Sequence, residues 1–287
     1  MKKLELGKKI NLVDIPKYSN LLEKIIYSTQ SDIKYKNISE VLREYEDERW
    51  GLMLKKISSK KFFSLEYLES LHVDKDVRCV SYEDGNFFLR NEAFMLEKHK
   101  SLYIKTISKY VKYASSIVEL GAGFGSKIVS IAKNYEFKNL SFYAGEYTNS
   151  GQSIIKKVAI NEGVDIKVGY CDLRKLEISG MDIPKNSIIF TSYAAHYVPQ
   201  ILDSFVNFFD KFKPLVVIHF EPFYEHHEVN NAYGILCKKY IELNDYSRNL
   251  QTVIENGCKK LNYKLIVNKN VLGSNPFLPI SVVEWTK

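Results

Sequence analysis

The sequence predicts an α/β fold with a mostly parallel sheet, preceded by a mainly helical segment. After residue 115, short apolar segments typical of strands alternate with stretches of helical periodicity, which is the pattern of strand–helix–strand crossovers. The first of these strands runs directly into a glycine-rich turn at 121–125. Before residue 90, apolar residues recur at three- and four-residue spacing instead. These observations predict a helical region over 1–90 and an α/β domain over 91–287.

The N-terminal region is expected to contain helices and one hairpin. Helical periodicity runs through 19–61, and a shorter helix is predicted over 62–71. The stretch 80–89 is typical of an extended hairpin that turns at Asp84-Gly85. A further helix over 91–113 leads into the glycine turn.

The C-terminal part is expected to alternate strands and helices. One long helix is predicted over 228–261, and a loop at 273–276 joins the last two strands. The strands are expected at 115–120, 140–146, 165–173, 187–193, 214–221, 263–271 and 280–285.

Composition narrows the possible functions. The formal net charge of +7 is spread over lysines interleaved with acidic residues, which indicates a solvated surface and disfavours nucleic-acid binding. No apolar run is long enough to span a bilayer, and the start of the chain lacks the apolar stretch of a secretory signal. Four scattered cysteines suggest reduced thiols in a cytoplasmic protein. The oligomeric state is left open.

The glycine turn indicates a nucleoside ligand that carries positive charge. Gly121, Gly123 and Gly125 form G-x-G-x-G, whereas a dinucleotide fingerprint places its third glycine one position later. Glycines let the backbone approach a ligand closely. Glu119, directly before the turn, would repel phosphates and attract an amine or another cation. Both features disfavour a nicotinamide-dependent oxidoreductase.

The turn resembles the first motif of the class I S-adenosylmethionine-dependent methyltransferases, E/D-x-G-x-G-x-G. Three later landmarks extend the resemblance: Glu146 ends the second strand, Asp172 ends the third, and 187–193 matches the fourth. The resemblance covers about the last two-thirds of the chain. It implies a Rossmann-like sheet of seven strands, mostly parallel, whose last strand is antiparallel. It also implies S-adenosylmethionine as the cofactor.

The resemblance implies a role for each cofactor-site residue. Glu119 would order the loop and act on the ligand's amine, Glu146 would bind the ribose hydroxyls, and Asp172 would receive the adenine amino group. The whole predicted cofactor site is Glu119, Gly121, Ala122, Gly123, Gly125, Glu146, Tyr147, Cys171, Asp172, Leu173 and Ser192.

Candidate catalytic residues lie just after the fourth and fifth strands. His196 can take up a proton near neutral pH or can cap the next helix, and Tyr193 can orient the acceptor or pack on the cofactor. Glu221 is expected to line the acceptor pocket. The segment 219–227 contains three histidines and two glutamates that could hold a metal, although no metal is expected.

The residues directly after the fourth strand narrow the choice of acceptor. Thr191-Ser192-Tyr193-Ala194 stands where base- and glutamine-methylating enzymes carry an N/D-P-P-Y-like turn, and the Pro-Cys pair of the 5-methylcytosine enzymes is missing. A small molecule, sugar or peptide in a biosynthetic pathway is therefore favoured. The alternatives are an RNA or protein acceptor, or a non-catalytic regulatory or scaffold subunit. The N-terminal region, with the aromatic residues at 87–88 and Phe94, is expected to act as a lid.

Overall fold

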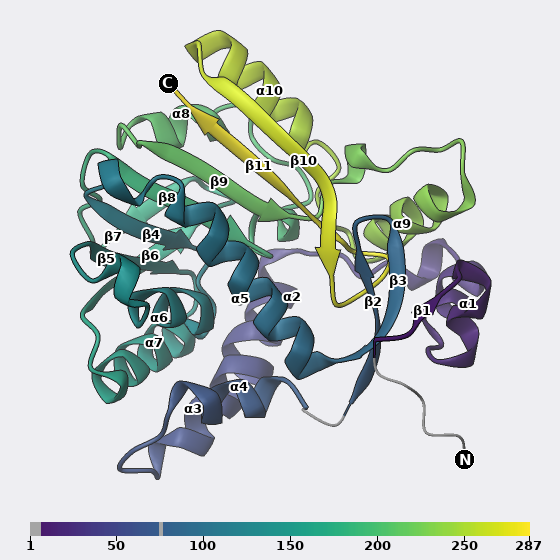
Figure 1. Cartoon of the computed structure of the whole chain (residues 1–287), viewed down its shortest axis with the longest axis horizontal. Helices are drawn as coiled ribbons and strands as arrows, with labels where there is room; N and C mark the ends of the chain where they lie inside the picture. The colour runs from purple at the N-terminus through teal and green to yellow at the C-terminus, as the bar shows by residue number, and fades with distance from the viewer. Residues whose placement is uncertain (1–6, 75–76) are drawn as a thin grey trace.

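The computed structural model describes residues 7–74 and 77–287 (Figure 1). The start of the chain, where the sequence argues against a secretory signal, lies outside these residues. Within them, none of the helices is both long and apolar enough to cross a membrane. The four cysteines are free thiols.

Over residues 7–74 and 77–287, a single mixed sheet of eleven strands organises the fold, so the prediction of seven strands was wrong. The α/β class is confirmed. Five central strands are parallel, and β11 runs antiparallel to both of its neighbours, β9 and β10. The order β6-β5-β4-β8-β9-β11-β10 is formed by β4 (Ser116–Leu120), β5 (Ser141–Glu146), β6 (Ile166–Asp172), β8 (Ser187–Ser192), β9 (Val216–Glu221), β10 (Lys264–Gly273) and β11 (Ile280–Thr286).

The additional strands lie at the two edges of the sheet. β7 (Glu177–Ser179) pairs with β6, while β2 (Arg78–Glu83) and β3 (Asn86–Asn91) form the expected hairpin. Its turn residues Asp84 and Gly85 both have positive φ, as a two-residue hairpin turn of type I′ requires. β2 pairs with β10, and β1 (Lys9–Ile10) pairs with β3. The N-terminal segment thus extends the sheet and is not only helical. The boundary at residue 90 stays a prediction.

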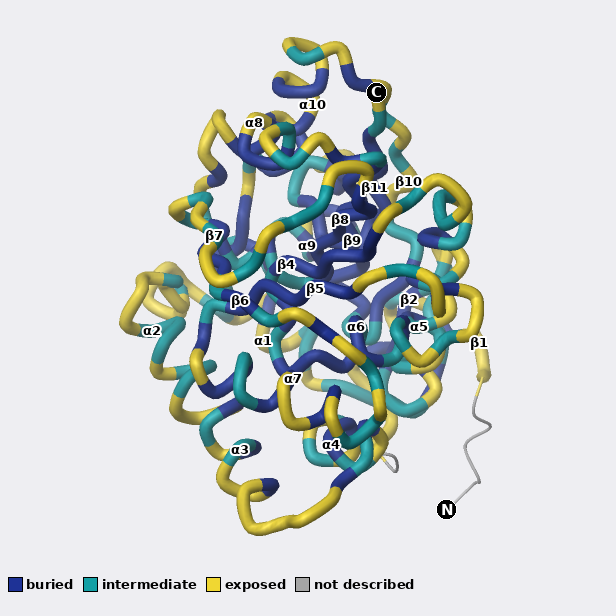
Figure 2. Tube along the Cα trace, turned by 90° about the vertical axis from the view of Figure 1, so that its left-hand side faces the viewer, coloured by how far each residue is buried: buried dark blue, intermediate teal, exposed yellow. Residues whose placement is uncertain are grey.

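Two hydrophobic layers enclose the sheet because successive strand residues point to opposite faces. Ile117 and Ile188 pack in one layer, whereas the next residues, Val118 and Ile189, pack in the other. The first layer is covered by α5 (Glu92–Ser108), α6 (Ser126–Ala132) and α7 (Asn149–Glu162) (Figures 1 and 2). The second layer is covered by α8 (Phe205–Asp210) and α10 (Leu250–Leu261).

The predicted helix over 228–261 is two helices, which corrects the sequence-based expectation. α9 (Ala232–Leu243) ends well before α10 begins. Between them Asp245 adopts φ 49°, and the Ser247 N–H donates to the His196 carbonyl (2.8 Å). The chain leaves the helical conformation here because this tertiary hydrogen bond ties it to the loop after β8.

The remaining α-helices that the structure describes belong to the N-terminal segment. They are α1 (Leu21–Tyr27), α2 (Ile38–Leu42), α3 (Trp50–Ser58) and α4 (Leu65–His72), with a π-helical turn, η3 (Arg43–Arg49), between α2 and α3. Glu46 of η3 accepts hydrogen bonds from the N–H groups of Asn149 (2.6 Å) and Ser150 (3.0 Å). These bonds anchor η3 to the first turn of α7, where free N–H groups favour a carboxylate.

Candidate active site

The glycine turn after β4 has the backbone that its sequence predicts. Gly121, Gly123 and Gly125 have φ values of 79°, 59° and 86°, all in the left-handed region that glycine tolerates best. A Cβ on Gly121 would collide with the Cβ of Ala194, and one on Gly123 would lie 3.2 Å from the Trp50 ring. The turn is therefore closely packed against the loop after β8 and against the N-terminal segment.

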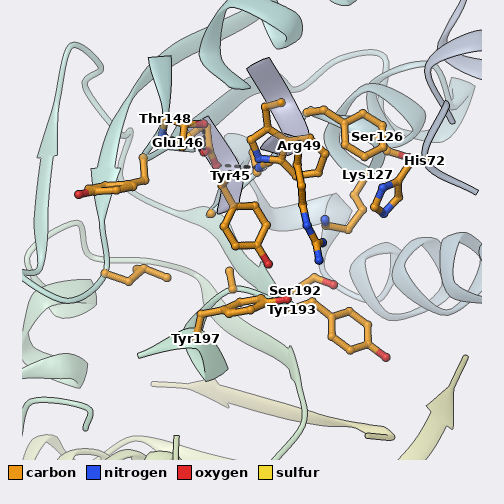
Figure 3. Close-up of a pocket in the computed structure, with 18 of the residues that line it drawn as sticks. Tyr45, Arg49, His72, Ser126, Lys127, Glu146, Thr148, Ser192, Tyr193 and Tyr197 are labelled. Carbon is orange, nitrogen blue, oxygen red and sulfur yellow. Dashed lines mark hydrogen bonds between the residues drawn. The ribbon is translucent and has the colours of Figure 1, made fainter. Parts of the chain in front are cut away.

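A cavity of about 520 Å³ opens at the carboxyl ends of β4, β5, β6 and β8 (Figure 3). This is where open parallel sheets bind their ligands. Of the predicted site residues, the following line it: Gly121, Ala122, Gly123, Glu146, Tyr147, Cys171, Asp172, Leu173, Ser192 and Tyr193. The cavity lining does not include Glu119, Gly125, His196 or Glu221.

Glu146 joins the second strand to the glycine turn. Its Oε2 accepts from the Gly123 N–H (2.8 Å), and its Oε1 accepts from the N–H (2.9 Å) and hydroxyl (2.6 Å) of Thr148. Burial raises the pKa of this carboxyl, and the hydrogen bonds oppose that shift. The three donors fix the carboxylate in one orientation at the cavity wall.

Asp172 ends β6 on the same wall. Its Oδ1 accepts from the backbone N–H (2.9 Å) and the Nε (3.3 Å) of Arg174. The Arg174 guanidinium lies 4.6 Å from the centre of the Tyr147 ring, which itself contacts Tyr170. The cavity wall therefore combines a hydrogen-bonded carboxylate with a flat aromatic surface.

Glu119 lies beneath the turn and not in the cavity. Its Oε2 accepts from the Ile128 N–H (3.1 Å), and its Oε1 pairs with Lys127 Nζ (3.1 Å). Burial raises the pKa of Glu119 to about 7, against the opposing effect of Lys127. Glu119 thus binds the start of α6, and its ion-pair partner Lys127, not Glu119 itself, lines the cavity. The role expected for Glu119 toward a ligand stays a prediction.

Tyr193 and Ser192 face the cavity together with side chains from α5. Tyr193 has φ 50°, a strained conformation for a bulky residue, and such strain is typical of functional sites. Its hydroxyl lies 3.5 Å from His99 Nε2, while His99 Nδ1 is 2.8 Å from the Met95 carbonyl and so carries the hydrogen. Ser192 donates to the Tyr103 hydroxyl (3.0 Å).

Glu221 and His196 hold the loop that carries Tyr193. The fully buried Glu221 carboxylate accepts from the N–H groups of Ala194 and Ala195 (3.0 Å each) and from His196 Nδ1 (3.0 Å). Burial alone would raise the pKa of Glu221, but the hydrogen bonds, that of His196 first, lower it. The His196 ring packs against the Tyr197 and Tyr246 rings. Both residues lie behind the cavity wall.

The histidines in β9 and in the segment after it make separate contacts. His219 lies between the Thr191 hydroxyl (3.0 Å) and the Trp285 indole N–H (3.2 Å). His226 contacts the hydroxyl of Ser281 (2.7 Å) and the side-chain carbonyl of Gln251 (3.0 Å). Across residues 7–74 and 77–287, no three His, Cys, Asp or Glu side chains are grouped so that they could hold a metal ion.

Sequence reasoning missed the side chains that close the cavity opposite the sheet. Figure 3 shows several of them around the same space. The His-x-x-x-Tyr spacing of α5 places two polar side chains on one helix face and was a usable signal. Nothing in the sequence marks η3 as part of the site. The missed residues are Tyr45, Arg49, Trp50, His72, His99, Lys100, Tyr103 and Lys127.

Comparison with known proteins identifies the fold. No protein-family model and no curated protein sequence matches the chain. Magnesium protoporphyrin IX methyltransferase from Synechocystis, solved with bound S-adenosylhomocysteine (SAH), is similar with a TM-score of 0.50 at 10% identity, over 87% of this chain and 99% of that one. The small RNA methyltransferase HEN1 gives a TM-score of 0.49 at 15% identity over 68% of this chain. The match spans only 26% of the HEN1 chain.

The fold is therefore that of the class I S-adenosylmethionine-dependent methyltransferases. The strand order and the antiparallel β11 agree with the sequence resemblance, and the similarity to the porphyrin methyltransferase extends over most of both chains. At 10% identity this likeness concerns the fold.

Proposed function

We propose that the protein transfers a methyl group from S-adenosylmethionine to a small-molecule, sugar or peptide acceptor in a biosynthetic pathway. One observation carries the proposal: Gly121 and Gly123, two glycines of the turn with positive φ, line the same cavity as Glu146 and Asp172. These residues come from three neighbouring strands, and their joint position fits a nucleoside with a free amine.

The cavity residues fit the cofactor chemically. A Cβ on Gly121 or Gly123 would come too close to neighbouring atoms, so the packing around the turn favours glycine at both positions. Glu146 would hold the ribose hydroxyls and Asp172 the adenine amino group, beside the Tyr147 ring. When bound, S-adenosylmethionine supplies an activated methyl group on a sulfonium.

The chain's own task is then to position the acceptor and to exclude water. Tyr193 is the residue we expect to contact the acceptor, since it lines the cavity next to Ser192. Its hydroxyl can donate to His99 Nε2, which leaves the oxygen lone pairs for the acceptor. Burial lowers the pKa of His99 to about 4, so this imidazole is neutral at pH 7. Glu221 and His196 would act as positioning residues through the Tyr193 loop.

The size and covering of the cavity support a small acceptor. Its volume of about 520 Å³ is in the range of small-molecule sites, which is about 300–1,000 Å³. Residues of η3, α3 and α4 form the wall opposite the sheet, which supports the expected covering role of the N-terminal segment.

Calorimetric titration of the purified protein with S-adenosylmethionine, SAH and NAD tests the proposal. We expect saturable binding of the first two and none of NAD. Binding of NAD alone would refute the proposed cofactor. If the adenosyl ligands bind, the next assay follows transfer of labelled methyl groups from S-adenosylmethionine to candidate acceptors. Transfer indicates an enzyme, whereas its absence with every acceptor indicates a non-catalytic binding subunit.

A further inference from the structure

Two cations, Arg49 and Lys127, project into one corner of the cavity, and the proposed methyl transfer leaves their charge without a role. Arg49 ends η3, and Lys127 lies in the first turn of α6. Both side chains line the cavity beside His72 (Figure 3). The corner is therefore formed by segments far apart in the sequence, which η3 brings together through its anchor on α7.

Each cation is only partly neutralised by the protein. Arg49 Nη2 pairs with Glu44 (2.8 Å), and a guanidinium has further N–H donors to offer. Lys127 pairs with Glu119, whose raised pKa leaves it partly protonated near neutral pH. The corner thus keeps a net positive charge, which attracts an anion, since Glu44 is shared between Arg49 and Lys36.

The charges of Arg49 and Lys127 also act on His72. Its ring packs against Trp50 and Phe124, and its pKa falls to about 4, first through burial and then through the charges of Arg49 and Lys127. A neutral imidazole beside these cations offers a hydrogen-bonding group and no competing negative charge. The Tyr45 and Trp50 rings, whose centres are 5.9 Å apart, form an apolar wall of the cavity beside the His72 imidazole.

We propose that Arg49 and Lys127 form a carboxylate-binding corner of the cavity. The carboxylate can come from the amino-acid part of the cofactor or from the acceptor, and the chemistry of recognition is the same in both cases: a planar anion bound by a guanidinium and an ammonium. This inference rests on the proposed function.

The test compares Arg49→Gln with Arg43→Gln. Arg43 begins the same π-helical turn but points to solvent, where it pairs with Glu40, so its removal changes the net charge equally outside the cavity. Arg49 is 45% exposed, and both variants should fold, which their melting temperatures verify. Titration with SAH is set beside titration with methylthioadenosine, which has the nucleoside and sulfur but no carboxylate.

If the corner binds the carboxylate of the cofactor, Arg49→Gln should weaken SAH binding at least tenfold and leave methylthioadenosine binding unchanged. The Arg43→Gln variant should bind both ligands as the wild type does. If the corner binds a carboxylate of the acceptor, Arg49→Gln should bind SAH as tightly as the wild type. With SAH saturating, the wild type would then bind benzoate at least tenfold better than benzamide, and Arg49→Gln would lose that preference.

Three results would overturn the inference. In the first, Arg49→Gln keeps both the SAH affinity and the preference for benzoate of the wild type. In the second, the wild type does not prefer benzoate, and Arg49→Gln binds SAH as tightly as the wild type does. In the third, Arg49→Gln loses affinity equally for SAH and for methylthioadenosine, which would mean general damage to the cavity. A wild type that does not bind SAH at all refutes the proposed function instead, and the benzoate comparison on the free protein still tests the corner.

Discussion

Replacing Glu146 by alanine should lower both the free energy of unfolding and the affinity for SAH, and the two effects can be measured separately. The variant removes the acceptor of the Gly123 N–H, the Thr148 N–H and the Thr148 hydroxyl. Each buried donor left without a partner costs about 1–3 kcal/mol, but water from the cavity can reach these groups, and a buried charge is removed as well. We expect a loss of about 2 kcal/mol in the free energy of unfolding.

The same variant should lose the ribose contacts of the cofactor. Charge-assisted hydrogen bonds contribute about 1.5–3 kcal/mol, so SAH affinity should fall by more than tenfold in a calorimetric titration. Thr148→Ala is the matched control. It removes the hydroxyl bonded to Glu146 and the N-cap of α7, at a cost of about 1 kcal/mol, and it keeps the carboxylate.

The control should therefore lose stability and retain SAH affinity within about threefold. If Glu146→Ala binds SAH as tightly as the wild type, the assignment of β5 to the ribose is wrong. If both variants lose affinity equally, the effect comes from the loosened turn and not from the carboxylate.

Three further variants test the rest of the site. Glu221→Gln points an amide N–H₂ group at backbone donors, so urea unfolding should show a loss of about 3 kcal/mol; an unchanged midpoint would contradict the positioning role. Gly123→Ala places a Cβ at φ 59° and 3.2 Å from Trp50, so we expect about 1–2 kcal/mol of destabilisation and weaker SAH binding; SAH binding at wild-type strength would show that the turn tolerates the methyl group. The raised pKa of Glu119 implies stability that is present below pH 4.5 and lost as pH rises toward about 7. From pH 5 to pH 8, Glu119→Gln should therefore gain on the wild type by up to about 3 kcal/mol; a pH-independent difference would refute the shift.

Local patterns in the sequence were enough to predict residues that share one wall of the cavity. The turn needs left-handed backbone at Gly121 and Gly123, and these positions are glycine because other residues are strained there. Glu146 and Asp172 could be placed because parallel strands end at the same edge of a sheet. Such features depend on a few adjacent residues, so they can be read directly.

The contacts that separate Glu221 from the cavity were not readable in this way. Glu221 appeared to face an acceptor, yet in the structure its carboxylate binds the backbone of residues 194–195. The sequence shows that a strand ends in a carboxylate. It does not show which N–H groups a loop from another strand will present to it.

The sequence by itself determined the α/β class, the glycine turn and the two carboxylates at the strand ends, because periodicity and backbone conformation are local properties. Only the tertiary structure decided how the cavity is closed. Arg49 reaches it because Glu46 binds the first turn of α7, about a hundred residues later in the chain. That contact depends on how two distant segments pack, and no local pattern in either segment encodes it.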